Sequence, residues 1–554
     1  MMSTLLLISD FNVAPLAGYV RNDAQEPLLR VVQAPYGLVE PILLSDHAVW
    51  AEAGADAWAL VWTRPEVVSP AFLHLVEDGV PLEQGWLDEV DQWIDGLIGN
   101  GARLRGALVP LWTLPPAIRR RGVGDLKAGG VQWALQLMNA RLVQRAETSA
   151  FLHVLDTPSI LASCPTRARD PKLWLMGKLP FANPIFRGVA DEAKAALRAL
   201  MGRAKKLVVV DLDDTLWGGS VGEVGWEALS LGGHDHVGEA HADFQRALKQ
   251  LGRRGILLAI ASRNEEAVAL EAIDRHPEMV LRRGDFAAWR IHWGDKAASV
   301  SSIVEELNIG LQDVVFIDDH PAERARVREA LPGVCVPEWP EDPALYADAL
   351  AGLRAFDVVQ VSQEDGERTR LYADERRRRA ARQTEDSLVS WLTSLELVVR
   401  AQPLCDESLQ RAAQLLNKTN QMNLRTRRMS AEDLLAWAGT PGCECWTFRV
   451  SDRFGDAGLC GLLGLQADGE GGQISDYVLS CRVMGRGVEE ALLHVATLRA
   501  RDLGWPALRV EALSTERNKP CRDFFSRVGG ADVASFLWNT SQLFPLPAHV
   551  ELCA

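Results

Sequence analysis

Residues 207–219 read Leu-Val-Val-Val-Asp-Leu-Asp-Asp-Thr-Leu-Trp-Gly-Gly, an apolar stretch that ends in carboxylates. The apolar run predicts a buried β-strand, and the acidic residues predict a loop at its carboxyl end. Side chains alternate along a strand, so Asp211 and Asp213 should leave it on the same side, with Leu212 pointing away. One carboxylate can then attack phosphorus while the other transfers a proton. The stretch therefore predicts a phosphoryl-transfer site.

Three later segments place side chains suited to phosphoryl transfer at the ends of predicted elements. A second apolar strand, 257–261, ends in Ser262-Arg263-Asn264, whose hydroxyl could hold a phosphoryl oxygen. Lys296 precedes a helical stretch and offers a compact ammonium to neutralise a nucleophile and a phosphate. A third strand, 314–317, ends in Asp318-Asp319, which carry the hard oxygen ligands that Mg²⁺ takes. Each residue alone would be an ordinary surface residue, but their order predicts one site.

In this order the segment resembles the haloacid dehalogenase (HAD) superfamily of phosphotransferases. The resemblance implies that Asp211 is a nucleophile that forms a phosphoaspartate, and that Asp213 acts first as an acid and then as a base. It also implies bound Mg²⁺, with candidate ligands Asp211, Asp213, Asp318 and Asp319. The candidate substrate-binding residues are Thr215, Ser262, Arg263 and Asn264. Since no large insertion follows Thr215 or Ser262, we expect an open site without a cap domain.

Length and composition predict a multidomain α/β protein. A chain of 554 residues suggests about three domains, and its 47% apolar and 24% charged residues are typical of a soluble globular protein. The net charge of −15 argues against general nucleic-acid binding. The apolar run at 5–8 is too brief for a signal sequence or membrane span. Nine irregularly spaced cysteines favour reduced thiols and a cytoplasmic location.

The amino-terminal part, residues 1–190, predicts an open α/β domain with parallel strands. Short apolar strands at 5–8, 57–62 and 104–111 alternate with helical stretches such as 131–145. Ser9-Asp10-Phe11-Asn12 lies where a hydrolase of the SGNH type would carry its serine. The Gly-Asp-Ser order is absent and no partner histidine is evident, so we predict an SGNH-like domain with a structural or docking role.

The remaining domain boundaries follow changes in sequence pattern. A helix at about 189–201 leads into a HAD-like domain, 191–356. A charged helical linker, 357–386, contains four consecutive arginines at 376–379 and then gives way to the last domain, 387–554. Such charge runs are mostly solvated helix faces, and docking of an acidic partner is the less common alternative.

The last domain carries a second chemical motif. An apolar strand, 474–481, is followed by a glycine-containing loop, 482–487, and a helix through 489–500. Glycines let backbone amides approach a phosphate at a helix amino terminus. The RxxGxG pattern resembles the acyl-CoA loop of GNAT acyltransferases, and it predicts binding of phosphopantetheine by Arg482, Gly485, Arg486, Gly487 and Asn518.

Cys481 stands directly before this loop. A thiol at a helix amino terminus beside Arg482 should have its thiolate favoured, as an acyl-accepting nucleophile requires. The alternative is a buried structural cysteine. We therefore add Cys481 to the candidate catalytic residues Asp211, Asp213 and Lys296.

Two longer stretches, 416–424 and 480–489, together with 211–219 and 170–174, resemble the FkbH-like proteins of polyketide biosynthesis. The resemblance implies an enzyme that takes a glyceryl unit from 1,3-bisphosphoglycerate, removes phosphate and loads the unit as a thioester on an acyl carrier protein. Within 416–424, candidate hydrogen-bonding partners of the glyceryl hydroxyls are Asn417, Lys418, Asn420, Gln421 and Asn423. Polar tracts of this kind are more often capped turns.

The implied chemistry needs two sites. An acyl phosphate is already activated, so a thiolate can displace its phosphate without ATP, whereas a phosphate monoester hydrolyses very slowly unaided. Two alternatives remain open: a HAD phosphatase fused to an acetyl-CoA-dependent GNAT acetyltransferase, and a carboxyl-terminal domain that only docks a carrier protein. Asp214 and Arg517 depart from the pattern of the family, and Arg517 could alter how a phosphate is held.

Overall fold

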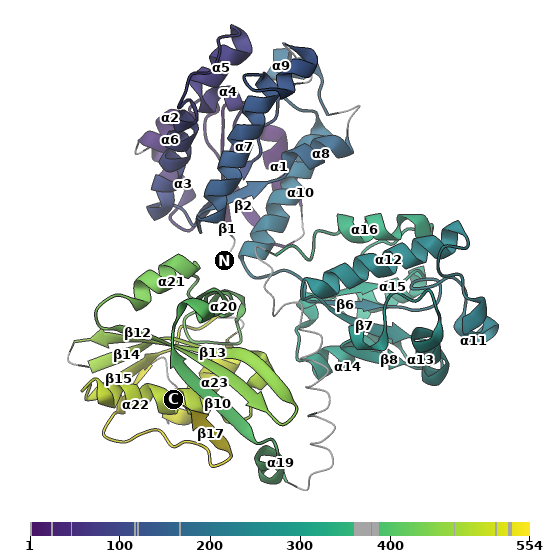
Figure 1. The fold of residues 1–554 in the computed structure, drawn as a ribbon, viewed down its shortest axis with the longest axis vertical. Coiled ribbons are helices and arrows are strands. Elements are labelled where there is room, and N and C mark those ends of the chain that lie inside the picture. Colours follow the sequence, from purple (N-terminus) through teal and green to yellow (C-terminus); the bar gives the residue numbers. More distant parts are fainter. Residues whose placement is uncertain are drawn as a thin grey trace. The chain divides into compact units, whose positions relative to one another are not determined.

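The computed structural model describes residues 3–23, 26–45, 47–115, 118, 121–164, 168–358, 378, 387–469, 471–515, 518–529 and 535–553 (Figure 1). Two parallel sheets and one mixed sheet, each packed with helices, confirm the predicted α/β class. The chain divides into two compact units, Met1–Met201 and Gly202–Ala554. No helix among the described residues is both long enough and apolar enough to cross a membrane.

The first unit is built on a five-stranded parallel sheet in the order β2-β1-β3-β4-β5. The strands are β1 Ser3–Ser9, β2 Leu29–Gln33, β3 Trp58–Trp62, β4 Gly106–Pro110 and β5 Leu152–Leu155. The helices are α1 Ala14–Asn22, α2 Val39–Leu44, α3 Ala48–Ala53, α4 Pro65–Val68, α5 Pro70–Glu77, α6 Leu87–Ile98, α7 Val131–Glu147, α8 Thr157–Ser163, α9 Pro171–Gly177 and α10 Asn183–Leu200.

Both faces of this sheet are covered, so its central strands are apolar on both sides. Leu5 and Leu7 pack with α1, α8 and α10 on one face. Leu6 and Ile8 pack with α2, α3, α5, α6 and α7 on the other. The alternation of strand side chains thus builds two hydrophobic layers from one apolar run.

Helix α10 belongs to the first unit. We predicted a helix at 189–201 that leads into the next domain, with a boundary at residue 190. The helix instead begins at Asn183, and its apolar stripe is buried against α1 and the sheet, including Ile185, Phe186, Val189, Ala193 and Leu197. The first compact unit therefore extends to Met201.

The second unit begins with a four-stranded parallel sheet in the order β8-β7-β6-β9. Its strands are β6 Leu207–Val210, β7 Leu257–Ser262, β8 Ala288–Ile291 and β9 Val314–Ile317. Its helices are α11 Val221–Val224, α12 His236–Arg253, α13 Glu266–Arg275, α14 Lys296–Leu307, α15 Pro321–Ala330 and α16 Tyr346–Gly352. Helices α12, α13 and α16 pack on one face, and α14 and α15 on the other. Between β6 and α12 the described chain forms only α11 and a short 3-10 turn, which agrees with the expected lack of a cap.

The rest of the second unit forms a mixed sheet in the order β16-β15-β14-β13-β12-β10-β17, and β11 pairs with β14. Its strands are β10 Leu397–Pro403, β11 Met422–Asn423, β12 Cys443–Asp452, β13 Gly455–Asp468, β14 Gly471–Leu479, β15 Ala507–Glu511, β16 Ser535–Asn539 and β17 Val550–Cys553. Its helices are α19 Leu388–Ser394, α20 Asp406–Lys418, α21 Ala431–Ala438, α22 Val488–Asp502 and α23 Lys519–Gly529. Helix α22 connects β14 to β15, which run parallel.

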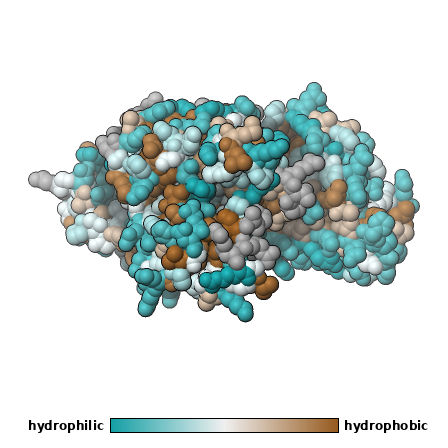
Figure 2. All heavy atoms as spheres, turned by 90° about the horizontal axis from the view of Figure 1, so that it is seen from above, coloured by the Kyte–Doolittle hydropathy of each residue, from teal (hydrophilic) through white to brown (hydrophobic). Residues whose placement is uncertain are grey.

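Apart from residues 357, 358 and Arg378, the predicted linker and its arginine run lie outside the described residues, as does Arg517. Arg378 itself is buried, and its guanidinium forms an ion pair with Asp452 at 2.6 Å. On the face drawn in Figure 2, hydrophobic residues lie scattered among hydrophilic ones, as is usual for a protein surface.

Candidate active site

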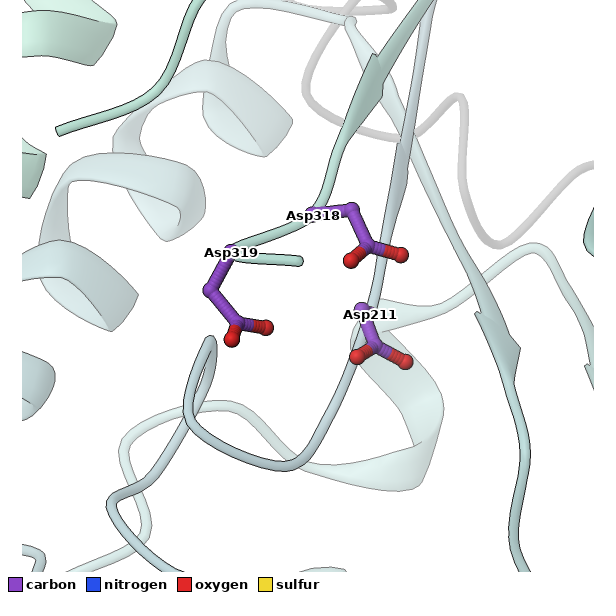
Figure 3. A group of neighbouring side chains, drawn as sticks. All are labelled: Asp211, Asp318 and Asp319. Carbon is purple, nitrogen blue, oxygen red and sulfur yellow. The ribbon is translucent and has the colours of Figure 1, made fainter. Parts of the chain in front are cut away.

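The carboxyl ends of β6 and β9 bring three carboxylates together. The amide of Asp211, just after β6, donates to the carbonyl of Ile317 at 3.0 Å and so keeps the two strand ends in register. Asp318 and Asp319 follow β9 directly. One carboxylate oxygen from each of the three residues lies within 4.8 Å of the other two (Figure 3). Such a group of oxygen atoms suits a hard divalent cation.

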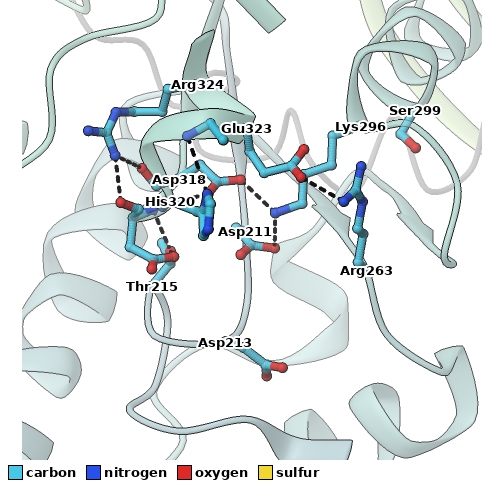
Figure 4. Close-up of polar contacts among 12 residues, drawn as sticks. Asp211, Asp213, Thr215, Arg263, Lys296, Ser299, Asp318, His320, Glu323 and Arg324 are labelled. Carbon is cyan, nitrogen blue, oxygen red and sulfur yellow. Dashed lines mark hydrogen bonds and ion pairs between the residues drawn. The ribbon is translucent and has the colours of Figure 1, made fainter. Parts of the chain in front are cut away.

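Lys296, the first residue of α14, connects two of these carboxylates. Its Nζ atom lies 2.6 Å from Oδ2 of Asp318 and 3.0 Å from Oδ1 of Asp211 (Figure 4). The side chain of Asp295 caps the helix by accepting from the amide of Ala297, which fixes where the lysine leaves the backbone. All three paired side chains are buried, so little water screens the ion pairs.

Burial dominates the electrostatics of this group. It raises the pKa of Asp211 and of Asp318, while Lys296 acts in the opposite direction. Burial alone would lower the pKa of Lys296, but the charges of the two carboxylates raise it overall. The lysine therefore stays protonated. Its charge favours the ionised forms of both carboxylates and so offsets part of the effect of burial on their pKa values.

One ammonium does not balance three carboxylates. Burial also raises the pKa of Asp319, against the hydrogen bond from Thr215. In addition, the buried Oδ1 atom of Asp211 has no well-aligned hydrogen-bond donor among the described residues, although Lys296 lies nearby. A divalent cation would supply the missing charge and ligand contact, so these residues fit Mg²⁺.

Thr215 lies beside this cluster as a positioning residue. Its hydroxyl donates to Oδ1 of Asp319 at 2.9 Å and accepts from the amide of Asp319 at 3.1 Å. The Thr215 side chain is fully buried. We predicted that it binds substrate, whereas the structure places it on a candidate metal ligand.

Asp213 points away from the three carboxylates (Figure 4). Its Oδ1 atom accepts from Nε1 of Trp217 at 2.9 Å and from the amide of Val221 at 3.2 Å. Its Oδ2 atom accepts from Nδ2 of Asn264 at 3.0 Å. The structure therefore does not bring Asp213 into the candidate metal cluster, and it uses Asn264, which we predicted to bind substrate, to orient Asp213 instead. Trp217 was missed as an orienting residue, although its spacing of four residues from Asp213 was visible.

Ser262 and Arg263 end β7 at the same edge of the sheet. The buried Ser262 hydroxyl hydrogen-bonds to Asp211, which lowers the pKa of that carboxyl against the effect of burial. Nη1 of Arg263 lies 2.8 Å from Oε1 of Glu323, and its side chain is 45% exposed. Arg263 is thus held by one carboxylate and still faces solvent.

The loop after β9 is fixed by residues that sequence reasoning missed. The amide of His320 donates to Oδ1 of Asp318 at 2.9 Å. Nη1 of the buried Arg324 donates to the carbonyls of Asp318 at 2.9 Å and Asp319 at 2.6 Å (Figure 4). An arginine six residues after an acidic pair is too common a spacing to signal this role. The His320 amide thus orients the Asp318 carboxylate, and Arg324 holds the backbone that carries both acidic residues.

Cys481 lies apart from the amino terminus of a long helix. It begins a 3-10 turn, Cys481–Val483, whereas α22 begins at Val488. We predicted that the thiol would lie at the start of this helix, and the position of α22 corrects that placement. The residue as a whole is neither fully buried nor fully exposed.

The glycine-containing loop 482–487 already has internal partners. The Gly485 amide donates to Oε1 of Glu489 at 2.6 Å, in the position that an anion would take. The buried Arg486 donates from Nη2 to the Arg482 carbonyl at 2.5 Å, and its Nη1 atom lies 3.7 Å from Oδ2 of Asp452. Two of the predicted phosphate-binding groups are therefore engaged within the protein.

The start of α22 is also closely packed. Gly487 has φ +88°, and a Cβ atom there would lie 2.8 Å from Nε2 of His549. The same histidine nitrogen is 2.8 Å from the Arg486 carbonyl. The glycine is thus required for both its backbone conformation and the close approach of the carboxyl-terminal segment.

Strand β11 fills a gap between β14 and β15. The two parallel strands pair only between Gly472–Ile474 and Leu508–Val510. Beyond that point β11 pairs with the end of β14, and the Leu424 amide donates to the Tyr477 carbonyl at 3.1 Å. The Leu513 amide completes the bridge by donating to the Leu424 carbonyl at 3.1 Å. Residues 422–424 therefore occupy the space between the diverging strands.

The polar tract before β11 supports this inserted segment. Asn417 exchanges hydrogen bonds with the backbone of Met429, and Asn420 accepts from Arg428. Asn423 donates to the carbonyls of Leu416 and Thr419. These three asparagines act as turn-stabilising residues; Lys418 ends α20, and Gln421 lies in the following turn.

Asn518 ties the same segment to the neighbouring loop. Its Nδ2 atom donates to the Asn423 carbonyl at 3.1 Å and the Leu513 carbonyl at 2.7 Å, and Oδ1 accepts from the Thr515 amide at 2.9 Å. The side chain is fully buried. We predicted that Asn518 binds phosphopantetheine, whereas the structure uses its amide to hold β11 in place.

Comparison with known proteins supports a Mg²⁺ site in this chain. No family model matches the chain, and no curated protein does either. Among solved structures, the chain is similar to the N-terminal part of the protein BF1531 from Bacteroides fragilis, which contains a phosphatase domain and was crystallised with Mg. The identity is 26%, the match covers 65% of this chain and 94% of that chain, and the TM-score is 0.59.

Two acetyltransferases match more weakly. A GNAT-family acetyltransferase from Staphylococcus aureus is 10% identical over 26% of this chain and 99% of its own, with a TM-score of 0.21. The ribosomal-protein-S18-alanine N-acetyltransferase from Escherichia coli is 11% identical over 24% of this chain and 76% of its own, with a TM-score of 0.19. Similarity at this level does not establish a shared fold. Over about two thirds of its length, however, the chain shares the fold of a Mg-bound structure that contains a phosphatase domain.

Proposed function

We propose that the chain is a Mg²⁺-dependent phosphatase that works through an aspartyl phosphate on Asp211. The observation that carries this proposal is the meeting of Asp211, Lys296, Asp318 and Asp319 at one edge of a parallel sheet. The similarity to a phosphatase-containing structure that binds Mg supports it.

The proposed mechanism assigns one task to each carboxylate. Asp211 attacks phosphorus, so that an oxygen–phosphorus bond forms as the bond to the leaving oxygen breaks. Asp213 protonates that leaving oxygen and later takes a proton from the water that hydrolyses the phosphoaspartate. Trp217 and Asn264 hold Asp213 for both steps.

Lys296 and a metal ion share the electrostatic work. Lys296 offsets the charge of the nucleophile and of the transferring phosphoryl group. Asp211, Asp318 and Asp319 would hold Mg²⁺, which offsets further negative charge on the phosphoryl oxygens. Thr215 orients the Asp319 carboxylate, His320 orients that of Asp318, and Arg324 holds the backbone of both acidic residues.

For the substrate we propose a glyceryl unit supplied as 1,3-bisphosphoglycerate. The Cys481 thiolate attacks the acyl-phosphate carbonyl, so that a carbon–sulfur bond forms and inorganic phosphate leaves. Asp211 then removes the 3-phosphate, and the thiol of a phosphopantetheine-bearing acyl carrier protein takes the glyceryl group. The partial exposure of Cys481 supports this role. All nine cysteines are free thiols, which supports the proposed cytoplasmic location.

A pantetheine arm needs a path to Cys481. A path between β14 and β15 would require residues 422–424 to move, because these residues pair with the end of β14 and accept a hydrogen bond from Leu513, which follows β15. Hydrogen exchange with and without the phosphopantetheine-bearing carrier protein tests this directly. Faster exchange at 422–424 on carrier addition indicates displacement, and unchanged exchange during acyl transfer indicates a different path.

The thioester step is tested by intact-protein mass spectrometry after incubation with 1,3-bisphosphoglycerate. Wild type should carry a glyceryl adduct, and Asp211→Asn should carry a phosphoglyceryl adduct, because it cannot remove the 3-phosphate. Cys481→Ala should carry neither. Cys405→Ala is the matched control, since Cys405 is exposed and hydrogen bonding from Ser408 lowers its thiol pKa. An adduct that survives in Cys481→Ala would refute the thioester step.

The phosphatase step is tested separately by phosphate release from 3-phosphoglyceryl thioester or a simple aryl phosphate. Chelation of Mg²⁺ and Asp211→Asn should each abolish release, while Cys481→Ala should leave aryl phosphate hydrolysis unchanged. Turnover in the presence of a chelator would contradict the metal-dependent mechanism. Acetylation of a small amine from acetyl-CoA, with no adduct on Cys481, would replace the glyceryl proposal with that of a fused acetyltransferase.

A further inference from the structure

In the sheet of the first unit, the order in which successive strands are added reverses at β1, since β2 lies on one side of β1 and β3, β4 and β5 follow on the other. Strand β1 pairs with β2 on one side and with β3 on the other, and all of these strands are parallel. In open α/β sheets, ligands bind outside the carboxyl ends of the strands at such a reversal. The segments that leave β1 and β3 there are Ser9–Asn12 and Thr63–Glu66.

A fixed arginine lies at this position. Both oxygens of the buried Asp10 side chain are used by Arg64, whose amide donates at 2.9 Å and whose Nε donates at 2.6 Å. The Arg64 guanidinium also lies 5.0 Å from the ring centre of Trp174 in α9. Its side chain is still 38% exposed, so its outer N–H groups remain available to a ligand.

Glu66 lies close to Arg64 and to a second arginine, Arg169. Oε2 of Glu66 is buried and accepts no hydrogen bond from the described residues. Arg169 donates from Nη2 to the Thr113 hydroxyl at 3.2 Å and lies 4.6 Å from the ring centre of Phe181. Glu66 interacts electrostatically with both arginines.

Burial opposes the charged forms of Glu66 and Arg169. Burial raises the pKa of Glu66, and burial lowers the pKa of Arg169 to about 10 despite the opposing charge of Glu66. Each group is therefore less well satisfied than it would be in water. Charged groups that are buried without full compensation concentrate at binding and catalytic sites.

We propose that Asp10, Arg64, Glu66, Thr113 and Arg169, here called the amino-terminal cluster, bind a small hydroxy acid. The carboxylate of the ligand pairs with the two guanidinium groups, and a hydroxyl donates to the free Oε2 of Glu66. Asp10 and Thr113 keep the arginines in position. This site belongs to the first unit and does not depend on the proposed phosphatase or acyl-transfer functions.

The test uses the full-length protein and three matched three-carbon probes: glycerate, propionate and glycerol. Hydrogen exchange locates binding independently of the Asp211 site. Glycerate should slow exchange in the peptides that contain Asp10, Arg64 and Arg169. Propionate, which lacks the hydroxyls, should bind about tenfold more weakly, and glycerol should not bind. No protection of these peptides by glycerate would overturn the proposal.

Variants separate binding from structural roles. Arg169→Met should remove protection by glycerate. If this variant fails to fold, Arg169→Lys replaces it in the test; because lysine keeps the charge, it should retain weaker binding. Glu66→Leu should remove the preference for glycerate over propionate. Arg141→Met breaks a partly exposed ion pair with Asp91 in the same unit and serves as the control. Full glycerate protection in Arg169→Met would also overturn the proposal.

Discussion

At the scale of single residues, the carboxylates of the site differ in the hydrogen-bond donors and cations that they contact. Lys296 pairs with two buried carboxylates at once, and Asp213 receives its own donors from Trp217, Val221 and Asn264. This separates Asp211, in the candidate metal cluster, from Asp213, the proposed proton-transfer group, although the two are only two residues apart in the chain. Different environments can thus give neighbouring carboxylates different roles.

Trp217→Phe tests the orientation of Asp213. The change removes one hydrogen bond to the carboxylate, so we expect kcat for phosphate release to fall about tenfold with little change in KM. Trp339→Phe is the control, because Trp339 is similarly buried but its Nε1 donates to no described residue. Equal losses in both variants would show that packing, rather than the hydrogen bond, explains the effect.

Lys296→Met tests the charge balance of the cluster. It leaves Asp211 and Asp318 buried without their cation, so we expect the free energy of unfolding in metal-free buffer to fall by about 3 kcal/mol. The double variant Lys296→Met, Asp318→Asn should recover part of this loss, because it removes one uncompensated charge. Denaturant titrations of both proteins measure the effect, and a further loss in the double variant would contradict it.

At the scale of elements, short segments between strands determine which surfaces are available. Strand β11 closes the gap between β14 and β15, and Glu489 in α22 accepts the loop amide of Gly485. The carboxyl-terminal part thus fills, with its own residues, both the gap between β14 and β15 and the position where the loop was predicted to bind a phosphate. Carrier binding in that place requires these contacts to be exchanged.

Asn518→Ala tests how firmly β11 is held. The change removes donors to two buried carbonyls, so we expect a loss of about 2–4 kcal/mol and faster hydrogen exchange at 422–424. Asn539→Ala, at an exposed position in β16, is the control and should cost less than about 1 kcal/mol. If exchange at 422–424 stays at the wild-type rate, Asn518 does not hold the strand.

His153 in β5 should make the first unit sensitive to acid. Its Nε2 atom is buried without a described partner, and burial lowers its pKa from 6.5 to about 4. Between these values the unfolded chain binds a proton that the folded chain refuses, so stability falls as the pH drops from 6.5 to 4, by up to about 3 kcal/mol.

His153→Phe should reduce this loss, since phenylalanine cannot be protonated and fits beside Trp58. Burial also lowers the pKa of His241 and His276, which lie in the second unit. Hydrogen exchange at residues 152–155 therefore measures the effect of His153 more directly than global unfolding does. An unchanged acid dependence there in the variant would rule out His153 as its cause.

At the scale of the whole molecule, the chain is organised as two units whose boundary follows burial. Helix α10 buries its apolar stripe in the first unit, and its Lys194 side chain, 2% exposed, forms an ion pair with Asp23 at 2.6 Å. The sheet of the second unit that carries Asp211 begins only after this helix has ended, at Leu207.

Truncation tests this boundary. A fragment of residues 1–201 should unfold cooperatively, whereas a fragment of residues 1–190 should be less stable by more than about 2–4 kcal/mol, the cost expected for losing buried Leu197 alone. Thermal and urea denaturation compare the two fragments. Equal stability would show that the second half of α10 is dispensable.

The sequence by itself determined the local features of this protein. The apolar runs predicted β6, β7 and β9 to within one residue at each end, because a buried strand needs a continuous apolar stretch. It also predicted that Asp211, Lys296 and Asp318 would meet, since carboxyl ends of parallel strands share one edge.

Only the tertiary structure decided which partners these side chains take. Trp217 and Asn264 turn Asp213 away from the metal cluster, Thr215 and Arg324 orient its ligands, and Arg486 turns inward to Asp452. The contacts of Asn264 with Asp213 and of Thr215 with Asp319 join residues that are 51 and 104 positions apart, and local pattern carries no information on such pairs. Propensity and periodicity act within a few residues, whereas burial and hydrogen bonding are settled only when distant segments pack.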